Sequence, residues 1–151
     1  MSDNVEHIIQ FDADYASRED LFRQVSDQLE AAGIVGPEFY QALVDREKDY
    51  PTGVPTDPAV GLPHTDGTYV RRNAIVCIRN ARELAWNEMC GDATDFVHPR
   101  LVFMLVMVKG GPHLQILQNI IEKIQDPALV NAALDAADEE AFKTAVNAFV
   151  A

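Results

Sequence analysis

The chain has 151 residues, 48% of them hydrophobic, which is enough to bury the core of one domain. Its 24 acidic residues outnumber its 12 basic ones, and a net charge of −12 argues against nucleic-acid binding, which needs clustered lysine and arginine. The longest apolar run, residues 101–108, is too short to cross a membrane, and no apolar signal segment begins the chain. We therefore expect a cytoplasmic protein without membrane insertion.

The first third of the chain predicts one strand followed by two helices. Residues 5–11 have a β-leaning composition, which favours a strand. Ser17 provides a helix-start signal, apolar residues then recur at four-residue spacing, and Gly33 closes that helix. Pro37 suits the first turn of a second helix, which must end before Pro51.

The rest of the chain continues this alternation of strands and helices. Residues 69–78 and 100–109 are expected to be strands, the second covered on both faces because it is almost wholly apolar. Residues 81–100 between them are mixed and predict partly irregular structure, with turns at residues 91–92 and 98–99. Three more helices should start at residues 110–112, 126–127 and 138–140, the last of them ending near Val150. The sequence thus predicts an α/β fold, a single domain over residues 1–151 with a mixed β-sheet flanked by helices on both faces.

The segment 54–67 contains the strongest candidate for chemistry. Pro63 fixes its own φ and biases the preceding residue toward extended geometry, so His64 follows on a stiff backbone at the end of a short strand. A neutral imidazole held in this way is a good nucleophile near neutral pH. The alternative interpretation is a histidine in a surface loop that has no functional role.

Three stretches together resemble a known family. They are residues 45–53 (Asp-Arg-Glu-Lys-Asp-Tyr-Pro-Thr-Gly), residues 59–64 (Ala-Val-Gly-Leu-Pro-His) and residues 110–117 (Gly-Gly-Pro-His-Leu-Gln-Ile-Leu). Their order and spacing are similar to those of the fructose/mannitol-type enzyme IIA domain of the bacterial sugar phosphotransferase system, over roughly residues 5–150. The Tyr-Pro-Thr-Gly sequence resembles the galactitol-type branch. Gly61 stands where the family more often has alanine, and Thr65 where a small residue or cysteine is usual.

The resemblance implies a function and a set of site residues. His64 would be phosphorylated on Nε2, Arg46 would be the arginine of the family's Arg-Glu pair, and His113 would lie beside His64. The donor would be the phosphocarrier protein HPr and the acceptor a cysteine of the cognate enzyme IIB. Neither a metal nor an organic cofactor is expected.

Residue chemistry supports these roles where it can be applied. Arg46 falls in the last turns of the second helix, and its guanidinium could fork onto phosphoryl oxygens. His113 begins a helix, where free backbone N–H groups favour an anion; the alternative is that it only caps that helix. Val54, Val60 and Leu62 could form an apolar rim on which both partner proteins dock.

Other readings of the polar residues are open. The same fold serves nitrogen-type regulatory proteins, in which phosphorylation controls partner binding rather than transport. A metal-dependent hydrolase could use His64, His98 and His113 as ligands, although their spacing lacks the short pairs common in zinc sites. We interpret His7 and His98 as structural. Asp57 and Asp66 flank His64 and could orient its second nitrogen, but both are also ordinary turn residues.

Overall fold

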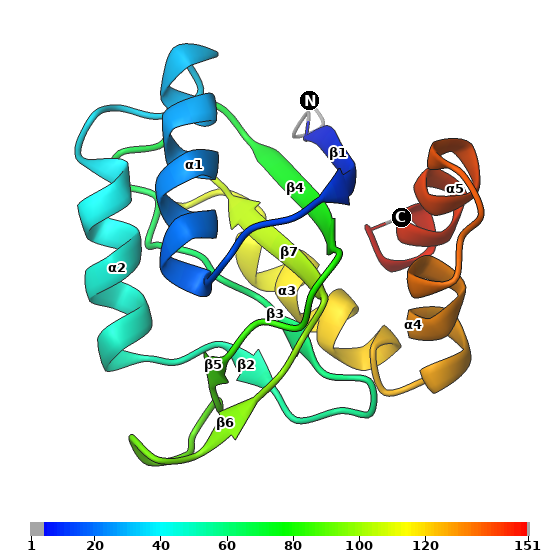
Figure 1. Ribbon diagram of the computed structural model, residues 1–151. Helices are drawn as coiled ribbons and strands as arrows, with labels where there is room; N and C mark the ends of the chain where they lie inside the picture. The colour runs from blue at the N-terminus through cyan, green and yellow to red at the C-terminus, as the bar shows by residue number, and fades with distance from the viewer. Residues whose placement is uncertain (1–4, 151) are drawn as a thin grey trace.

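A computed structural model describes residues 5–150 and contains a five-stranded sheet in the order β1-β4-β7-β3-β2 (Figure 1). The strands are β1 (Glu6–Ala13), β4 (Ala74–Asn80), β7 (Leu101–Val106), β3 (Val60–Gly61) and β2 (Gly53–Val54). β1 runs parallel to β4 and β3 parallel to β7, whereas the β4–β7 and β2–β3 pairs are antiparallel. The sheet is therefore mixed, as predicted.

Helices cover both faces of this sheet, which confirms the predicted fold class (Figure 1). On one face lie α1 (Arg18–Ala31) and α2 (Phe39–Asp49), and on the other α3 (His113–Lys123), α4 (Pro127–Leu134) and α5 (Glu139–Val150). Alternate residues of β4 separate the two cores: Val76 packs with α1 and α2, and Cys77 packs with the three later helices. Cys77 is thus a buried core residue, and burial raises the pKa of its thiol to about 12.

The helix starts follow the predicted capping residues. Ser17 accepts a hydrogen bond from the backbone N–H of Asp20, and Asp126 accepts one from Ala128. Gly33 after α1 has φ +75°, the left-handed conformation that glycine adopts at low cost. No helix within residues 5–150 is long and apolar enough to span a membrane.

Two predicted segments differ from the structure. The strand expected at 69–78 begins only at Ala74, because Val70 closes a turn onto the carbonyl of Gly67 and Arg71 donates to Ile34. The stretch 81–100, expected to be partly irregular and without a named strand, contains a small antiparallel pair, β5 (Trp86–Asn87) and β6 (Phe96–Val97). Strands of two residues carry too short a pattern to be seen in a sequence.

Candidate functional site

His64 lies where the chain leaves β3 along the end of β7. The carbonyl of Pro63 accepts a hydrogen bond of 3.0 Å from the backbone N–H of Leu105, and His64 itself bridges to Leu105 in parallel. Pairing with β7 thus extends past the two residues of β3. This places the half-buried imidazole on a backbone fixed by the central sheet, as the Pro-His sequence predicted.

A backbone contact fixes the chemistry of the imidazole. Nδ1 of His64 lies 2.8 Å from the carbonyl oxygen of Leu62. A carbonyl can only accept, so Nδ1 carries the proton and donates, and Nε2 is the nitrogen with the lone pair. In the neutral imidazole, this contact therefore selects the tautomer with the lone pair on Nε2.

The turn after His64 packs tightly against the chain that leaves β7. Gly67 has φ +92°, and a Cβ at this position would collide with the carbonyl of Met107 and lie 2.5 Å from the nitrogen of Lys109. Asp66 accepts hydrogen bonds from the backbone N–H and the hydroxyl of Thr68, at 2.9 and 2.8 Å. These bonds hold the pKa of Asp66 below its ordinary value, and Lys109 adds to the effect through its charge. The carboxylate thus holds the turn, while the partner of Nδ1 is a backbone carbonyl.

Arg46 reaches this turn from α2. With Ala42 it lines a hollow of about 290 Å³ whose opposite wall is the turn, from Thr65 to Tyr69. Its guanidinium lies 4.6 Å from the centre of the Tyr50 ring, and its charge also helps to lower the pKa of Asp66. The buried Nε of Arg46 has no hydrogen-bond partner among the groups that the structure describes. The fold therefore brings Arg46 to the segment that carries His64, and the N–H at Nε of Arg46 makes no hydrogen bond to a described group.

His113 is described only in its backbone, as the first residue of α3. The prediction that its side chain lies beside His64 therefore falls outside the described residues. The backbone does connect the two regions, because the turn at Gly67 packs on residues 107–109, which lead directly into α3. Pro112, which precedes α3, supplies no side-chain hydrogen bond to the first turn of that helix.

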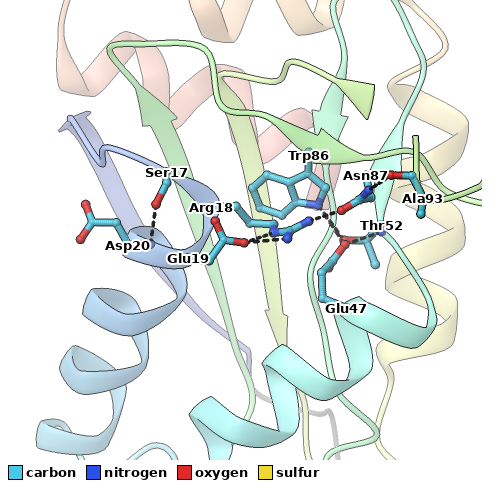
Figure 2. Close-up of polar contacts among 9 residues, drawn as sticks. All are labelled: Ser17, Arg18, Glu19, Asp20, Glu47, Thr52, Trp86, Asn87 and Ala93. Atoms are coloured by element: carbon cyan, nitrogen blue, oxygen red, sulfur yellow. Dashed lines mark hydrogen bonds and ion pairs between the residues drawn. The ribbon is translucent and has the colours of Figure 1, made fainter. Parts of the chain in front are cut away.

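A buried polar cluster lies directly beside Arg46 and was not foreseen. The Glu47 carboxylate accepts bonds from the backbone N–H of Thr52 at 2.7 Å, its hydroxyl at 2.6 Å, and the indole N–H of Trp86 at 3.1 Å (Figure 2). Burial raises the pKa of Glu47 above its ordinary value, although these hydrogen bonds act against the rise. The cluster borders a second hollow, of about 580 Å³, that also contacts Arg18 and Asn87. The sequence showed the Arg-Glu pair but no sign of a tryptophan partner.

The predicted apolar rim is wrong. Val54, Val60 and Leu62 are all buried in the core that faces α3, α4 and α5, because the short strands direct them inward. The large apolar side chains exposed in this part of the fold are instead Tyr50, 63% exposed, and Tyr69, 41% exposed.

The remaining histidines lie away from His64. His7 is exposed on β1, and His98 is exposed before the start of β7, whereas His64 pairs near the end of that strand. His98 lines a separate hollow together with Asp57. Among the side chains that the structure describes, no group of three or more His, Cys, Asp or Glu is arranged to hold a metal.

Comparisons with known proteins identify relatives in sequence and in fold. The galactitol-specific EIIA component of Escherichia coli K12 is 24% identical over 121 residues, 80% of this chain and 79% of that protein. Among solved structures, the mannitol IIA of Escherichia coli has a TM-score of 0.72 at 20% identity, covering 91% of this chain and 94% of that one. The nitrogen regulatory protein IIA-Ntr of Neisseria meningitidis has a TM-score of 0.74 at 22% identity, covering 91% and 92%.

A family model described as phosphoenolpyruvate-dependent sugar phosphotransferase system, EIIA 2, matches residues 4–148, nearly the whole chain. The chain belongs to this family of phosphotransferase system EIIA domains.

Proposed function

We propose that this EIIA domain carries a phosphoryl group on Nε2 of His64, received from phospho-HPr and passed to a cysteine of an enzyme IIB. The observation that supports this most directly is the bond between Nδ1 of His64 and the carbonyl of Leu62. It leaves the lone pair on Nε2, the nitrogen that must attack phosphorus. A system of the galactitol type fits the relative from Escherichia coli, and the transfer would take place in the cytoplasm.

The transfer is an in-line displacement at phosphorus. The lone pair of Nε2 forms the new N–P bond while the N–P bond to the donor histidine breaks, and the electrons of that bond return to the donor imidazole. In the second step the cysteine thiolate attacks phosphorus, and His64 leaves as neutral imidazole. Negative charge spreads over the equatorial oxygens in both steps, so catalysis depends on positioning and on cationic donors.

Arg46 is the side chain that we propose to donate hydrogen bonds to those phosphoryl oxygens. Arg46 lines the hollow beside Thr65, where its guanidinium could donate to a phosphoryl group. The first turn of α3 would add backbone N–H groups, and His113 is proposed to donate from the same helix start.

The proposal that an enzyme IIB is a partner rests on the likeness of this chain to a solved complex. One similar structure is the mannitol IIA of Escherichia coli bound to phosphorylated mannitol IIB, with a TM-score of 0.73 at 20% identity and coverage of 92% of this chain and 93% of that one. We propose that an enzyme IIB likewise binds this chain, on the side that carries His64. The likeness to IIA-Ntr keeps a regulatory role as the second candidate, in which phospho-His64 alters partner binding and is not passed to a IIB cysteine.

Reconstitution tests the proposal. Incubation with phosphoenolpyruvate, enzyme I and HPr should add one phosphoryl group by mass spectrometry, and His64→Ala should abolish this acid-labile, base-stable label. His7→Ala and His98→Ala are matched controls that should be labelled normally. A His64→Ala protein that is labelled like the wild type would exclude the assignment. Transfer from the labelled protein to an enzyme IIB encoded beside it separates transport from regulation.

A further inference from the structure

We propose that Glu47 is a positioning residue for His64, acting through Thr52 and Leu62 to set the tautomer of the imidazole; this role rests on the proposed function of His64. Glu47 does not belong to the hollow beside Arg46 and the turn, and it is 4% exposed. Its influence would therefore pass through the chain between α2 and His64. That chain contains a continuous series of hydrogen bonds.

The first link joins Glu47 to Thr52. The carboxylate holds both the backbone N–H and the hydroxyl of Thr52, so this residue is fixed in position and in orientation. Thr52 itself is 2% exposed and immediately precedes β2. The carboxylate thus sets where the strand beside β3 begins.

The second and third links continue from Thr52 to the imidazole. The carbonyl of Thr52 accepts a bond of 3.0 Å from the backbone N–H of Leu62. The carbonyl at the other end of Leu62 then accepts the Nδ1 proton of His64 at 2.8 Å. A displacement of Thr52 would therefore shift Leu62, whose carbonyl holds the imidazole. The β7 contact at Leu105 fixes the Pro63 peptide but not the Leu62 carbonyl.

Trp86 supports the same segment from behind. Its indole donates to Glu47 and is fully buried, and a Cβ at Gly61 would lie only 3.2 Å from two of its ring carbons. Gly61 therefore lets the indole pack flat on β3, immediately before Leu62. This explains why glycine suits position 61 in this chain, where the family more often has alanine.

Stability alone is a poor explanation for a carboxylate in this place. Moving a charge out of water costs free energy that hydrogen bonds repay only in part, and an apolar residue of similar volume often does as well. A carboxylate can, however, accept several bonds at fixed angles at once, which an apolar residue cannot. The arrangement is thus suited to orientation.

The test compares three variants and reads the imidazole directly. Glu47→Ala removes the acceptor, and Glu47→Gln keeps an oxygen that can accept from Thr52 and Trp86. Phe142→Leu weakens the same core that Leu62 belongs to, but at a ring that packs on Phe11 of β1. The ring-nitrogen NMR shifts of His64 report its tautomer. We expect Glu47→Ala to move His64 toward the Nε2–H tautomer that free histidine prefers and to slow phosphoryl transfer about 10- to 100-fold. The other two variants should retain the wild-type tautomer and most of the rate.

The tautomer is the deciding observation. An unchanged His64 tautomer in folded Glu47→Ala would overturn the proposal, whatever the rate of transfer. A shift that also occurs in Phe142→Leu would overturn it too, because the cause would then be general destabilisation. The proposed function is tested separately by labelling: a wild-type protein that HPr does not phosphorylate would refute that function, while the ring-nitrogen shifts would still decide the role of Glu47.

Discussion

Arg46 and Glu47 are neighbours on the last turns of α2, and their surroundings are opposite. Glu47 turns into the core and accepts three hydrogen bonds, from two groups of Thr52 and from Trp86. Arg46 turns to the hollow beside the His64 turn, where its buried Nε has no partner among the described residues. A satisfied buried group maintains the fold, whereas an unsatisfied one at a hollow is prepared for something that binds there. The two sides of one helix end thus differ in their contacts: Glu47 is satisfied within the protein and is proposed to act on His64 indirectly, whereas Arg46 is proposed to meet the phosphoryl group itself.

Arg46→Ala should have the largest effect of the substitutions on α2. Losing a charge-assisted donor to the transition state typically costs about 2–4 kcal/mol, or roughly 10²- to 10³-fold in rate. Arg46→Lys should recover little of this, because an ammonium cannot make the forked contact. Single-turnover transfer from phospho-HPr, followed by rapid quenching, measures the rates.

The same variants test the division between the two sides. The Nε of Arg46 makes no hydrogen bond to a described residue, so Arg46→Ala leaves no buried group without its partner. The free energy of unfolding in urea should therefore change by no more than about 1 kcal/mol in this variant. A variant that transfers at the wild-type rate while folding normally would remove Arg46 from the site.

Trp86→Phe should show the converse behaviour. It withdraws one donor from the buried Glu47 carboxylate and should cost about 1–3 kcal/mol of unfolding free energy. The transfer rate should stay near that of the wild type, since both bonds from Thr52 remain. Urea denaturation and the single-turnover assay on one preparation give both numbers. A large loss of transfer rate in Trp86→Phe without a loss of unfolding free energy would contradict this expectation, because Trp86 would then behave like Arg46.

The pH dependence of stability tests the state of Glu47. Because burial raises its pKa in the folded protein above the ordinary 4.5, the folded state holds a proton that the unfolded state has already released. The stability associated with that proton is complete below the ordinary pKa and is lost as pH rises through the folded pKa. Glu47→Gln cannot titrate, so the unfolding free energy of the wild type should fall relative to that of the variant across this range. A relative increase would mean that the hydrogen bonds outweigh burial.

The sequence predicts most of the fold because its signals are local. Ser17, Gly33 and Asp126 mark helix ends through contacts within a few residues, and all three are confirmed. The strand at residues 101–106 was evident as an apolar run. The β5–β6 pair was missed because it contains only two residues per strand.

The candidate site was less accessible to sequence reasoning. The residues themselves favoured His64 as a nucleophile and Arg46 as a hydrogen-bond donor to phosphoryl oxygens. Only the family resemblance indicated that the two belong to one site. The Nδ1 partner is the backbone carbonyl of Leu62, a group that every residue possesses. The bond between Trp86 and Glu47 spans 39 positions and follows no spacing rule. Leu62 was wrongly expected at the surface, because two-residue strands such as the neighbouring β3 show no alternating pattern that would tell the buried face from the exposed one.

Tyr50 offers the finest test of the comparison, with the smallest expected effect. Its ring lies 4.6 Å from the Arg46 guanidinium while 63% of the residue is exposed, so the contact is a cation–π interaction at the surface. Such a contact contributes about 0.5–1 kcal/mol, which corresponds to a rate change of roughly two- to fivefold if it orients Arg46 toward the phosphoryl group. Tyr50→Leu should lose this factor, and Tyr50→Phe, which keeps the ring, should not. In an Arg46→Ala background the Leu substitution should have no further effect, because its partner is gone. An equal loss in both backgrounds would show that Tyr50 acts on its own, for example by contacting the partner protein.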